Sequence, residues 1–66
     1  MYRIKNDSGL VFENQKTTAD YIGIDQSTLS RILNGKQTAS KVIAYCIVKT
    51  FNCDAEILDF FDRIEG

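Results

Sequence analysis

Two short apolar repeats separated by Gly23 constrain this chain more than any other feature of its sequence, and the first of them is Ala19 with Ile22. The second repeat has the i, i+3, i+4 spacing of one helical face: Leu29, Ile32 and Leu33. Gly23 can end the helix before it, because glycine enters the left-handed backbone region without steric cost. Asn14 is a suitable N-cap for that first helix, and the Asn-Gly pair after Leu33 stops the second. We therefore predict helices over residues 15–22 and 26–34, joined by a tight turn as in a helix-turn-helix unit.

A third helix is predicted over residues 40–51, where apolar residues recur at helical spacing and Ser40 is a suitable N-cap. Cys46 lies within this run and Cys53 lies just beyond it. Their separation fits neither a CxxC pair nor a zinc ligand set, and the chain has no histidine to complete a metal site. We expect both cysteines to be buried, reduced structural thiols rather than a disulfide, and we expect no cofactor.

A fourth helix is predicted over residues 55–64, with Asp54 as its cap. Its inward face is expected to carry three apolar residues: Ile57, Phe61 and Ile64. Leu58 and Phe60 extend the apolar surface beyond that face. This wide surface either packs beneath the N-terminal segment or forms a dimer contact, and the pattern leaves both interpretations open.

Residues 2–13 have the pattern of a short β-hairpin that packs on the helices. Tyr2 and Ile4, and then Leu10 and Phe12, alternate with other residues on the two sides of an Asn-Asp-Ser-Gly turn. Such a hairpin is not stable alone, so it must pack on the helical body. A short first helix is the competing interpretation, although the turn residues would break it in the middle.

The whole chain, residues 1–66, is predicted to be one compact, mostly α-helical helix-turn-helix domain with about four short helices and an N-terminal β-hairpin. Its longest unbroken apolar run is seven residues, Val42–Val48, far below the roughly 20 that cross a bilayer. The N-terminal segment lacks the apolar stretch of a secretory signal. We therefore expect a cytoplasmic protein, bacterial or phage-encoded, with no membrane partner.

The net charge of −1 hides a strong asymmetry along the chain. Residues 26–50 hold four cations and no carboxylate, a local charge of +4: Arg31, Lys36, Lys41 and Lys49. Residues 51–66 hold five carboxylates against Arg63, a local charge of −4. Affinity for phosphates depends on the local patch rather than on the average. The basic segment therefore favours nucleic-acid binding, while two merely solvated faces are the alternative.

The segment 15–36 resembles the helix-turn-helix of the lambda-repressor-like family, which includes phage repressors, Cro proteins and Xre-type regulators. That family has an opening Gln, a small residue four positions later, a turn glycine, a polar start to the second helix, core apolar residues and an Asn-Gly-basic ending. The matching residues are Gln15, Ala19, Gly23, Ile24, Asp25 to Thr28, Leu29, Ile32 and Asn34-Gly35-Lys36. With the apolar helix over 40–51, the resemblance covers about three quarters of the chain.

The second motif helix has a polar face that suits base recognition. Because Leu29 and Ile32 point inward, five polar residues are expected to point outward: Gln26, Ser27, Thr28, Ser30 and Arg31. Glutamine pairs with adenine through two hydrogen bonds, serine and threonine bond several bases, and arginine pairs with guanine or phosphate. This face therefore favours reading of the major groove.

The resemblance also implies individual roles. It places Gln26 and Ser27 on base edges, and it has Gln15 brace Gln26 while touching a phosphate. It has Asn34 donate to a phosphate, with Lys36 adding positive charge.

Other charged residues flank this set. Lys16 and Lys41 are further candidates for phosphate contacts, and Arg3 and Lys5 are candidate backbone contacts from the N-terminal segment. Asp25 stands at the start of the recognition helix, where it repels phosphate unless its side chain caps the helix.

The sequence favours a regulator over an enzyme, because it has no histidine, no nucleophile beside a base and no phosphate-binding glycine loop. We expect a sequence-specific regulator that binds a double-stranded DNA operator of a prophage or mobile element, without a small-molecule substrate. A homodimer is expected, because one short recognition helix reads few bases alone. Two alternatives remain: an adaptor that binds a repressor, recombinase or polymerase through the acidic last helix with Phe60 and Phe61, or an excisionase-like factor that bends DNA.

Overall fold

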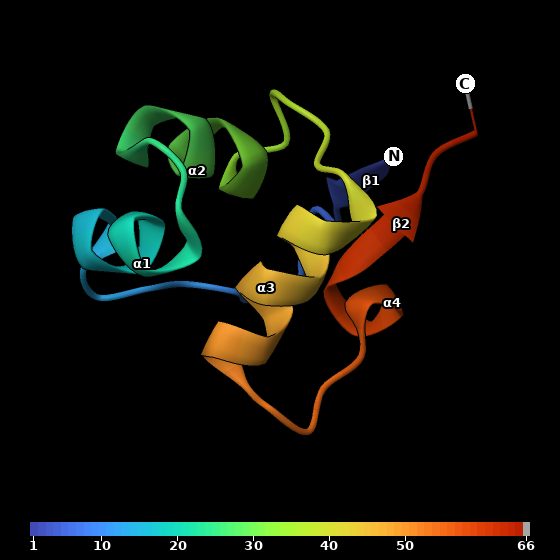
Figure 1. The fold of residues 1–66 in the computed structure, drawn as a ribbon. Helices are drawn as coiled ribbons and strands as arrows, with labels where there is room; N and C mark the ends of the chain where they lie inside the picture. Colours follow the sequence, from blue (N-terminus) through green and yellow to red (C-terminus); the bar gives the residue numbers. More distant parts are fainter. Residues whose placement is uncertain (66) are drawn as a thin grey trace.

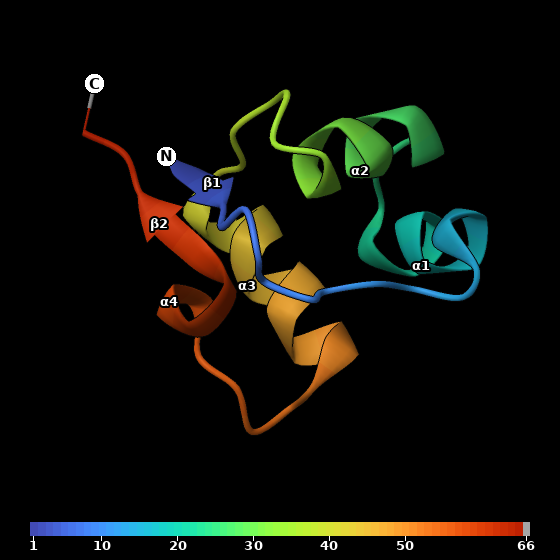
Figure 2. The same cartoon turned by 180° about the vertical axis from the view of Figure 1, so that it is seen from behind.

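The computed structural model describes residues 1–65, in which four short helices accompany a two-stranded antiparallel sheet. In chain order the elements are β1 (Tyr2–Ile4), α1 (Gln15–Ile22), α2 (Gln26–Leu33), α3 (Lys41–Phe51), α4 (Ile57–Phe60) and β2 (Phe61–Arg63). Helices α1 and α2 stand together at one end, α3 crosses the middle, and α4 lies with the sheet at the other end (Figures 1 and 2). The predicted class, mostly helical with an antiparallel strand pair that includes the N-terminal strand, is confirmed.

Helix α1 has the predicted bounds because both of its ends are set locally. The Asn14 side chain accepts a hydrogen bond from the Thr17 backbone N–H at 3.0 Å, which satisfies one of the free donors of the first turn. At the other end Gly23 takes a left-handed conformation with φ 96°. Its N–H donates to the Ala19 carbonyl at 2.8 Å.

Helices α2 and α3 each differ from the prediction by one terminal residue. Helix α2 ends at Leu33, and Asn34 is its C-cap. Helix α3 begins at Lys41, because Ser40 is extended and acts as the N-cap. The Ser40 hydroxyl accepts a hydrogen bond from the Ile43 N–H at 3.3 Å, as the capping role requires.

The predicted fourth helix over residues 55–64 is wrong over most of its length. Helix α4 covers Ile57–Phe60 only, and the chain then becomes extended in β2. Glu56, not Asp54, is the N-cap, and its N–H donates to the Asp59 carboxylate at 2.8 Å. The helix stops there because β2 gains backbone partners in β1 and at the same time buries Phe61 completely.

The predicted hairpin over residues 2–13 has the wrong second strand. Strand β1 pairs with β2, with Tyr2 opposite Arg63 and Ile4 opposite Phe61. On its other edge, Tyr2 exchanges two backbone hydrogen bonds of 2.7 Å with Ala39. The expected partner segment forms no strand, because Leu10 is buried in the core and Phe12 packs edge-on against another aromatic ring. Both backbone edges of β1 are therefore used by segments far away in the sequence.

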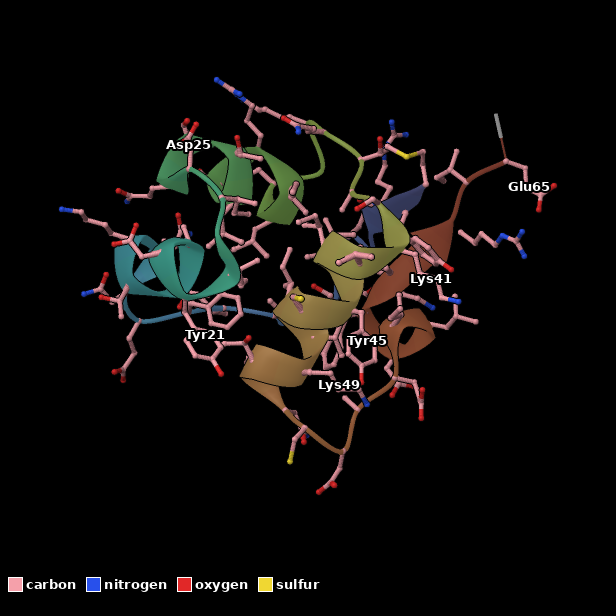
Figure 3. All side chains as sticks on the ribbon, viewed as in Figure 1. Tyr21, Asp25, Lys41, Tyr45, Lys49 and Glu65 are labelled. Atoms are coloured by element: carbon pink, nitrogen blue, oxygen red, sulfur yellow. The ribbon has the colours of Figure 1, made fainter. Side chains whose placement is uncertain are left out.

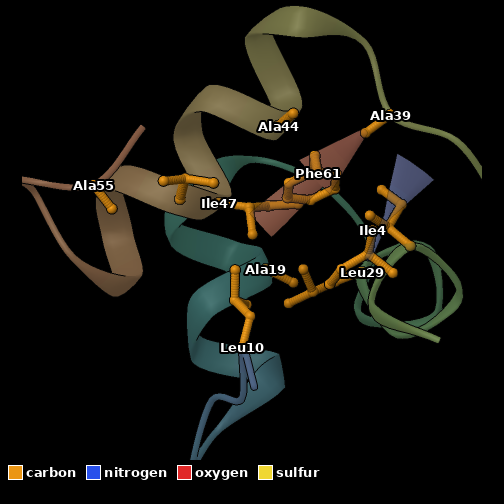
Figure 4. Packing of buried hydrophobic residues seen from close by; sticks show 11 residues of the cluster. Ile4, Leu10, Ala19, Leu29, Ala39, Ala44, Ile47, Ala55 and Phe61 are labelled. Carbon is orange, nitrogen blue, oxygen red and sulfur yellow. The ribbon is translucent and has the colours of Figure 1, made fainter. Parts of the chain in front are cut away.

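One apolar core connects α2 to β1 and β2 near the chain ends (Figure 4). Ala44, Ile47 and Val48 of α3 are fully buried, together with Leu29 of α2 and Phe61 of β2. No helix within the described residues 1–65 combines the length and the apolar character that a bilayer crossing needs.

The two cysteines have different environments. Both are free thiols, as expected, and Cys46 is half-buried on α3. Cys53 is exposed, so the expectation that it is buried is wrong. Its exposure follows from its place in the turn after α3, where its side chain lies outside the core cluster.

Candidate nucleic-acid interface

One side of α2 is anchored to the body of the domain. Leu29 and Ile32 are 0% and 1% exposed, and Leu29 shares the core with Ala19 of α1, which is also fully buried (Figure 4). Burying each of the two larger side chains contributes roughly 1.5–3 kcal/mol. The small Ala19 side chain lets the two motif helices approach closely. These contacts fix the rotation of α2 about its own axis, and thereby decide which residues face outward.

The other side of α2 is polar and accessible. Gln26, Ser27 and Arg31 are exposed, while Thr28 and Ser30 are half-buried. Ser27 and Arg31 are four residues apart and so share one side of the helix, as do Gln26 and Ser30. The structure therefore brings the five candidate base-reading residues together on one outward surface of α2.

Asp25 marks the start of α2 and lies exposed at the end of the molecule formed by the two motif helices (Figure 3). It has the extended backbone of an N-cap, with φ −71° and ψ 147°, and its carbonyl accepts from the Leu29 N–H at 3.0 Å. Its carboxylate accepts no capping hydrogen bond from the helix within residues 1–65. The first-turn amides of α2 therefore lack the side-chain cap that the sequence suggested, and the carboxylate stays available to other donors.

The C-terminal end of α2 leads into a basic turn. Asn34 Nδ2 donates to Ser30 Oγ at 3.3 Å, which connects the C-cap to the polar side of the helix. Gly35 then reverses the chain in a left-handed conformation with φ 74°. The Lys36 N–H donates to the Arg31 carbonyl at 2.9 Å, and the Lys36 side chain is exposed. Asn34, Lys36 and Arg31 are thus gathered at one end of the candidate interface.

Gln15 and Lys16 form the start of α1. Gln15 is half-buried and Lys16 is exposed. In both views the first turn of α1 lies on the same side of the molecule as the first turn of α2 (Figures 1 and 2). Both residues therefore lie on the side of the domain where α2 presents Gln26.

Two cations of the basic segment lie elsewhere. Lys41 borders a hollow between α3 and α4 together with Glu56 and Asp59, away from the residues on α2. Lys49 Nζ donates to the Ala55 carbonyl at 2.6 Å and to the Cys53 carbonyl at 3.3 Å, so it holds the turn after α3. The sequence analysis missed this role of Lys49, although a lysine in the last turn of a helix commonly binds nearby carbonyls.

The N-terminal cations are also divided. Lys5 Nζ lies 3.6 Å from the Asp62 carboxylate and so pairs with β2. Arg3 is exposed on β1. Because β1 is bridged to Ala39, Arg3 belongs to the strand that adjoins the loop after α2.

The surface expected for the protein-adaptor alternative is not formed as predicted. Phe61 is completely buried, so it cannot contact a partner. Phe60 is half-buried, and its ring packs edge-on against Phe51 with the centroids 5.4 Å apart. Both rings therefore stabilise the domain itself.

Comparison with known proteins gives one result that agrees with this geometry. A family model described as a helix-turn-helix matches residues 14–58, which include α1, α2 and α3. Neither a curated protein nor a solved structure matches the chain. Among residues 1–65, no three side chains of the His, Cys, Asp and Glu types gather to hold a metal ion.

Proposed function

From the premise that the chain belongs to the Cro/C1-type helix-turn-helix family, whose domains are DNA-binding and regulatory rather than catalytic, we propose that it is a repressor- or Cro-type regulator that reads the major groove with α2. The proposal includes a homodimer bound to a two-fold symmetric operator of a prophage or mobile element, in the cytoplasm of the host. The matched region is 45 of 66 residues (14 to 58), and it contains every candidate interface residue except Arg3 and Lys5.

The observation that carries the proposal is the division of α2 into two sides. Leu29 and Ile32 are buried, whereas Gln26, Ser27 and Arg31 are exposed. A helix fits the major groove of B-DNA, and these three side-chain types recognise base edges or phosphates there. The residues at the first turn of a recognition helix reach the bases most directly, which gives Gln26 and Ser27 the leading roles.

Phosphate contacts are proposed for the residues around this face. Lys36 and Asn34 lie just after α2, and Lys16 and Gln15 lie at the start of α1. Such contacts position a protein on the duplex without specifying sequence. The start of α1 and the loop after α2 flank the recognition helix, so they suit the two phosphate backbones beside one groove.

Asp25 adds a restriction on the operator. Its carboxylate is exposed and is not occupied as a helix cap. A carboxylate in the major groove accepts a hydrogen bond from the cytosine amino group but repels phosphate. We therefore expect Asp25 to lie over a base edge rather than over the backbone.

Selection of bound duplexes from a random DNA pool tests the proposal directly. The best duplex is then titrated at two salt concentrations, because contacts to several phosphates make affinity fall steeply as salt rises. We expect a symmetric site with a steep salt dependence. Recovery of no preferred duplex, with weak binding at low salt only, contradicts the proposal and favours a protein partner. A preferred duplex whose ends approach each other on binding favours the DNA-bending alternative.

A further inference from the structure

We propose that a second copy of this chain docks on the face formed by α3 and α4, which is called the α3/α4 face below. Its exposed apolar residues are Val42 and Tyr45 of α3 and Leu58 of α4, which are 69%, 51% and 59% exposed. Val42 and Tyr45 are three residues apart and therefore neighbours on one side of α3. A small domain that leaves three large apolar side chains uncovered on two helices in contact has an apolar surface that association can bury.

A hollow between the two helices gives this face its shape. Tyr45 and Lys41 line its α3 wall, while Glu56, Leu58 and Asp59 line its α4 wall. Figure 3 shows Tyr45 and Lys41 directed toward the same side of α3. Apolar side chains are thus present on both walls, so a partner side chain entering the hollow contacts apolar groups from two helices.

The charges on the two walls are opposite. Lys41 stands on the α3 wall, and Glu56 and Asp59 stand on the α4 wall. The ion pairs among residues 1–65 join Lys5 to Asp62 and Arg63 to Glu65, so Lys41 and Glu56 have no ionic partner within the described chain. Both carboxylates belong to the capping box of α4, in which the Asp59 carboxylate accepts the Glu56 N–H at 2.8 Å and the Glu56 carboxylate faces the Asp59 N–H. A carboxylate keeps further acceptor sites beside such a bond, so the exposed Lys41 and Glu56 are charges that a partner can pair.

This arrangement complements itself under two-fold symmetry. If the two-fold axis runs along the hollow, the α3 wall of one copy faces the α4 wall of the other. Lys41 of each copy then faces Glu56 of its partner, and Tyr45 faces Leu58. A two-fold contact requires one surface to match itself in this way. Since each wall finds its opposite on an identical copy, a second copy is the occupant that this face fits best.

The position of α2 also favours a second copy as the occupant of the α3/α4 face, and this step rests on the proposed function. Recognition helices on successive half-sites lie about 34 Å apart, so each must lie about 17 Å from the two-fold axis. The molecule measures 29 × 24 × 21 Å, and it can reach that distance only if the contact lies away from α2. In both views α3 separates α2 from α4, so docking on the α3/α4 face leaves α2 uncovered (Figures 1 and 2).

Mixing two charge-reversed chains tests the contact without DNA. Lys41→Glu alone places two carboxylates opposite each other at both symmetric contacts, and Glu56→Lys alone places two ammonium groups there. In a 1:1 mixture, each glutamate at position 41 faces a lysine at position 56, and the unchanged Lys41 faces the unchanged Glu56. Sedimentation equilibrium of the full chains should give the 7.5 kDa monomer mass for each variant alone and twice that mass for the mixture.

A matched pair of apolar substitutions tests the centre of the face. Leu58→Asp should weaken dimerisation by about tenfold or more, because it buries an unpaired charge in the contact. Val11→Asp is the control, since Val11 is 68% exposed but borders none of the hollows near α3. It should leave the dimer mass unchanged.

The outcomes separate this inference from the proposed function. Dimerisation of the mixture, with monomeric single variants, supports the α3/α4 face. A mixture that stays monomeric while the wild type dimerises overturns it, as does a wild type that is monomeric both free and on the selected duplex. Binding of Leu58→Asp to a single half-site measures the α2 function separately. If that binding is retained, failure to dimerise concerns the docking surface alone. If neither Leu58→Asp nor the wild type binds the half-site, the DNA-reading proposal fails.

Discussion

The helix-turn-helix segment and the terminal sheet are held by hydrogen bonds of very different range. In α1 the N-cap bond joins Asn14 to Thr17, three residues away, and the C-cap bond joins Gly23 to Ala19, four residues away. In the sheet, the Lys5 N–H donates to the Phe60 carbonyl at 2.9 Å, near the other end of the chain. The boundaries of the first region can therefore be read from adjacent residues, whereas those of the second depend on the folded domain.

We expect the two regions also to differ in role, with the sheet contributing to stability and the outward side of α2 to the proposed recognition. Phe61 and its partner Ile4 in the sheet are buried, so they contribute to folding, while Gln26 and Arg31 are exposed and contribute little to it. Changes in the sheet should therefore alter the free energy of unfolding and leave operator preference unchanged. Changes on the outward side of α2 should do the reverse. The following predictions test that division.

The largest effect is expected for Phe61→Ala. Removing a fully buried ring should lower the free energy of unfolding by about 3–5 kcal/mol, through lost burial and a residual cavity. Urea unfolding followed by circular dichroism measures the loss. Val11→Ala is the exposed control and should change the same quantity by less than about 0.5 kcal/mol. Equal effects of the two substitutions would contradict the buried position of Phe61.

The strand pairing can be tested with milder changes at the same place. Ile4→Val and Phe61→Leu should couple by at least about 0.5 kcal/mol in a double-mutant cycle, because the two positions are paired in the sheet. Additive effects would instead agree with a helix that continues through residue 64.

The next effect concerns binding rather than folding. Gln26→Ala should cost about 1–3 kcal/mol on the selected operator and relax the preference at one base position, because it removes the hydrogen bonds proposed to that base. Competition titrations with single-base variants of the operator measure both quantities. The unfolding midpoint should stay unchanged, since Gln26 is exposed.

Lys36→Ala provides the contrast to Gln26→Ala. It should weaken binding to all duplexes alike and reduce the slope of log affinity against log salt by about 1, as the loss of one phosphate contact requires. If Lys36→Ala changed base preference, or if Gln26→Ala weakened all sequences equally, the assignment of the outward side of α2 would be wrong.

A smaller effect is expected at the start of α1. Asn14→Ala removes the acceptor for the Thr17 N–H and should lower the free energy of unfolding by about 1 kcal/mol. Asn14→Asp keeps an acceptor and should restore most of the stability. If both variants were equally unstable, the cap would not explain where this helix begins.

The smallest effect is expected at the ion pair on the sheet. Lys5 and Asp62 have side chains that are 38% and 64% exposed, so solvent screens their attraction. Lys5→Ala should lower the free energy of unfolding by about 0.2–1 kcal/mol, and less at high salt. A loss comparable with that of Phe61→Ala would mean that charge rather than burial holds β1 against β2.

The candidate interface was predictable to the extent that its residues lie on α2. The apolar spacing of Leu29 and Ile32 determines which side of that helix faces outward, and the polar residues on that side follow. The positions of Lys41 and Lys49 were not predictable from charge. Lys41 lies beside α4, and Lys49 binds two carbonyls of the next turn. Cations that follow one another along the chain therefore lie on separate surfaces of the folded domain.

The sequence alone determined the two motif helices, the family and the outward polar face, because caps and apolar spacing act between residues three or four apart. Only the tertiary structure decided that residues 61–63 are a strand, that β1 pairs with them rather than with residues 10–12, and that the α3/α4 face stays uncovered. The physical reason is competition for burial. A strand at one end of the chain takes the partner that buries Phe61 and Ile4 together, and local alternation does not specify that partner.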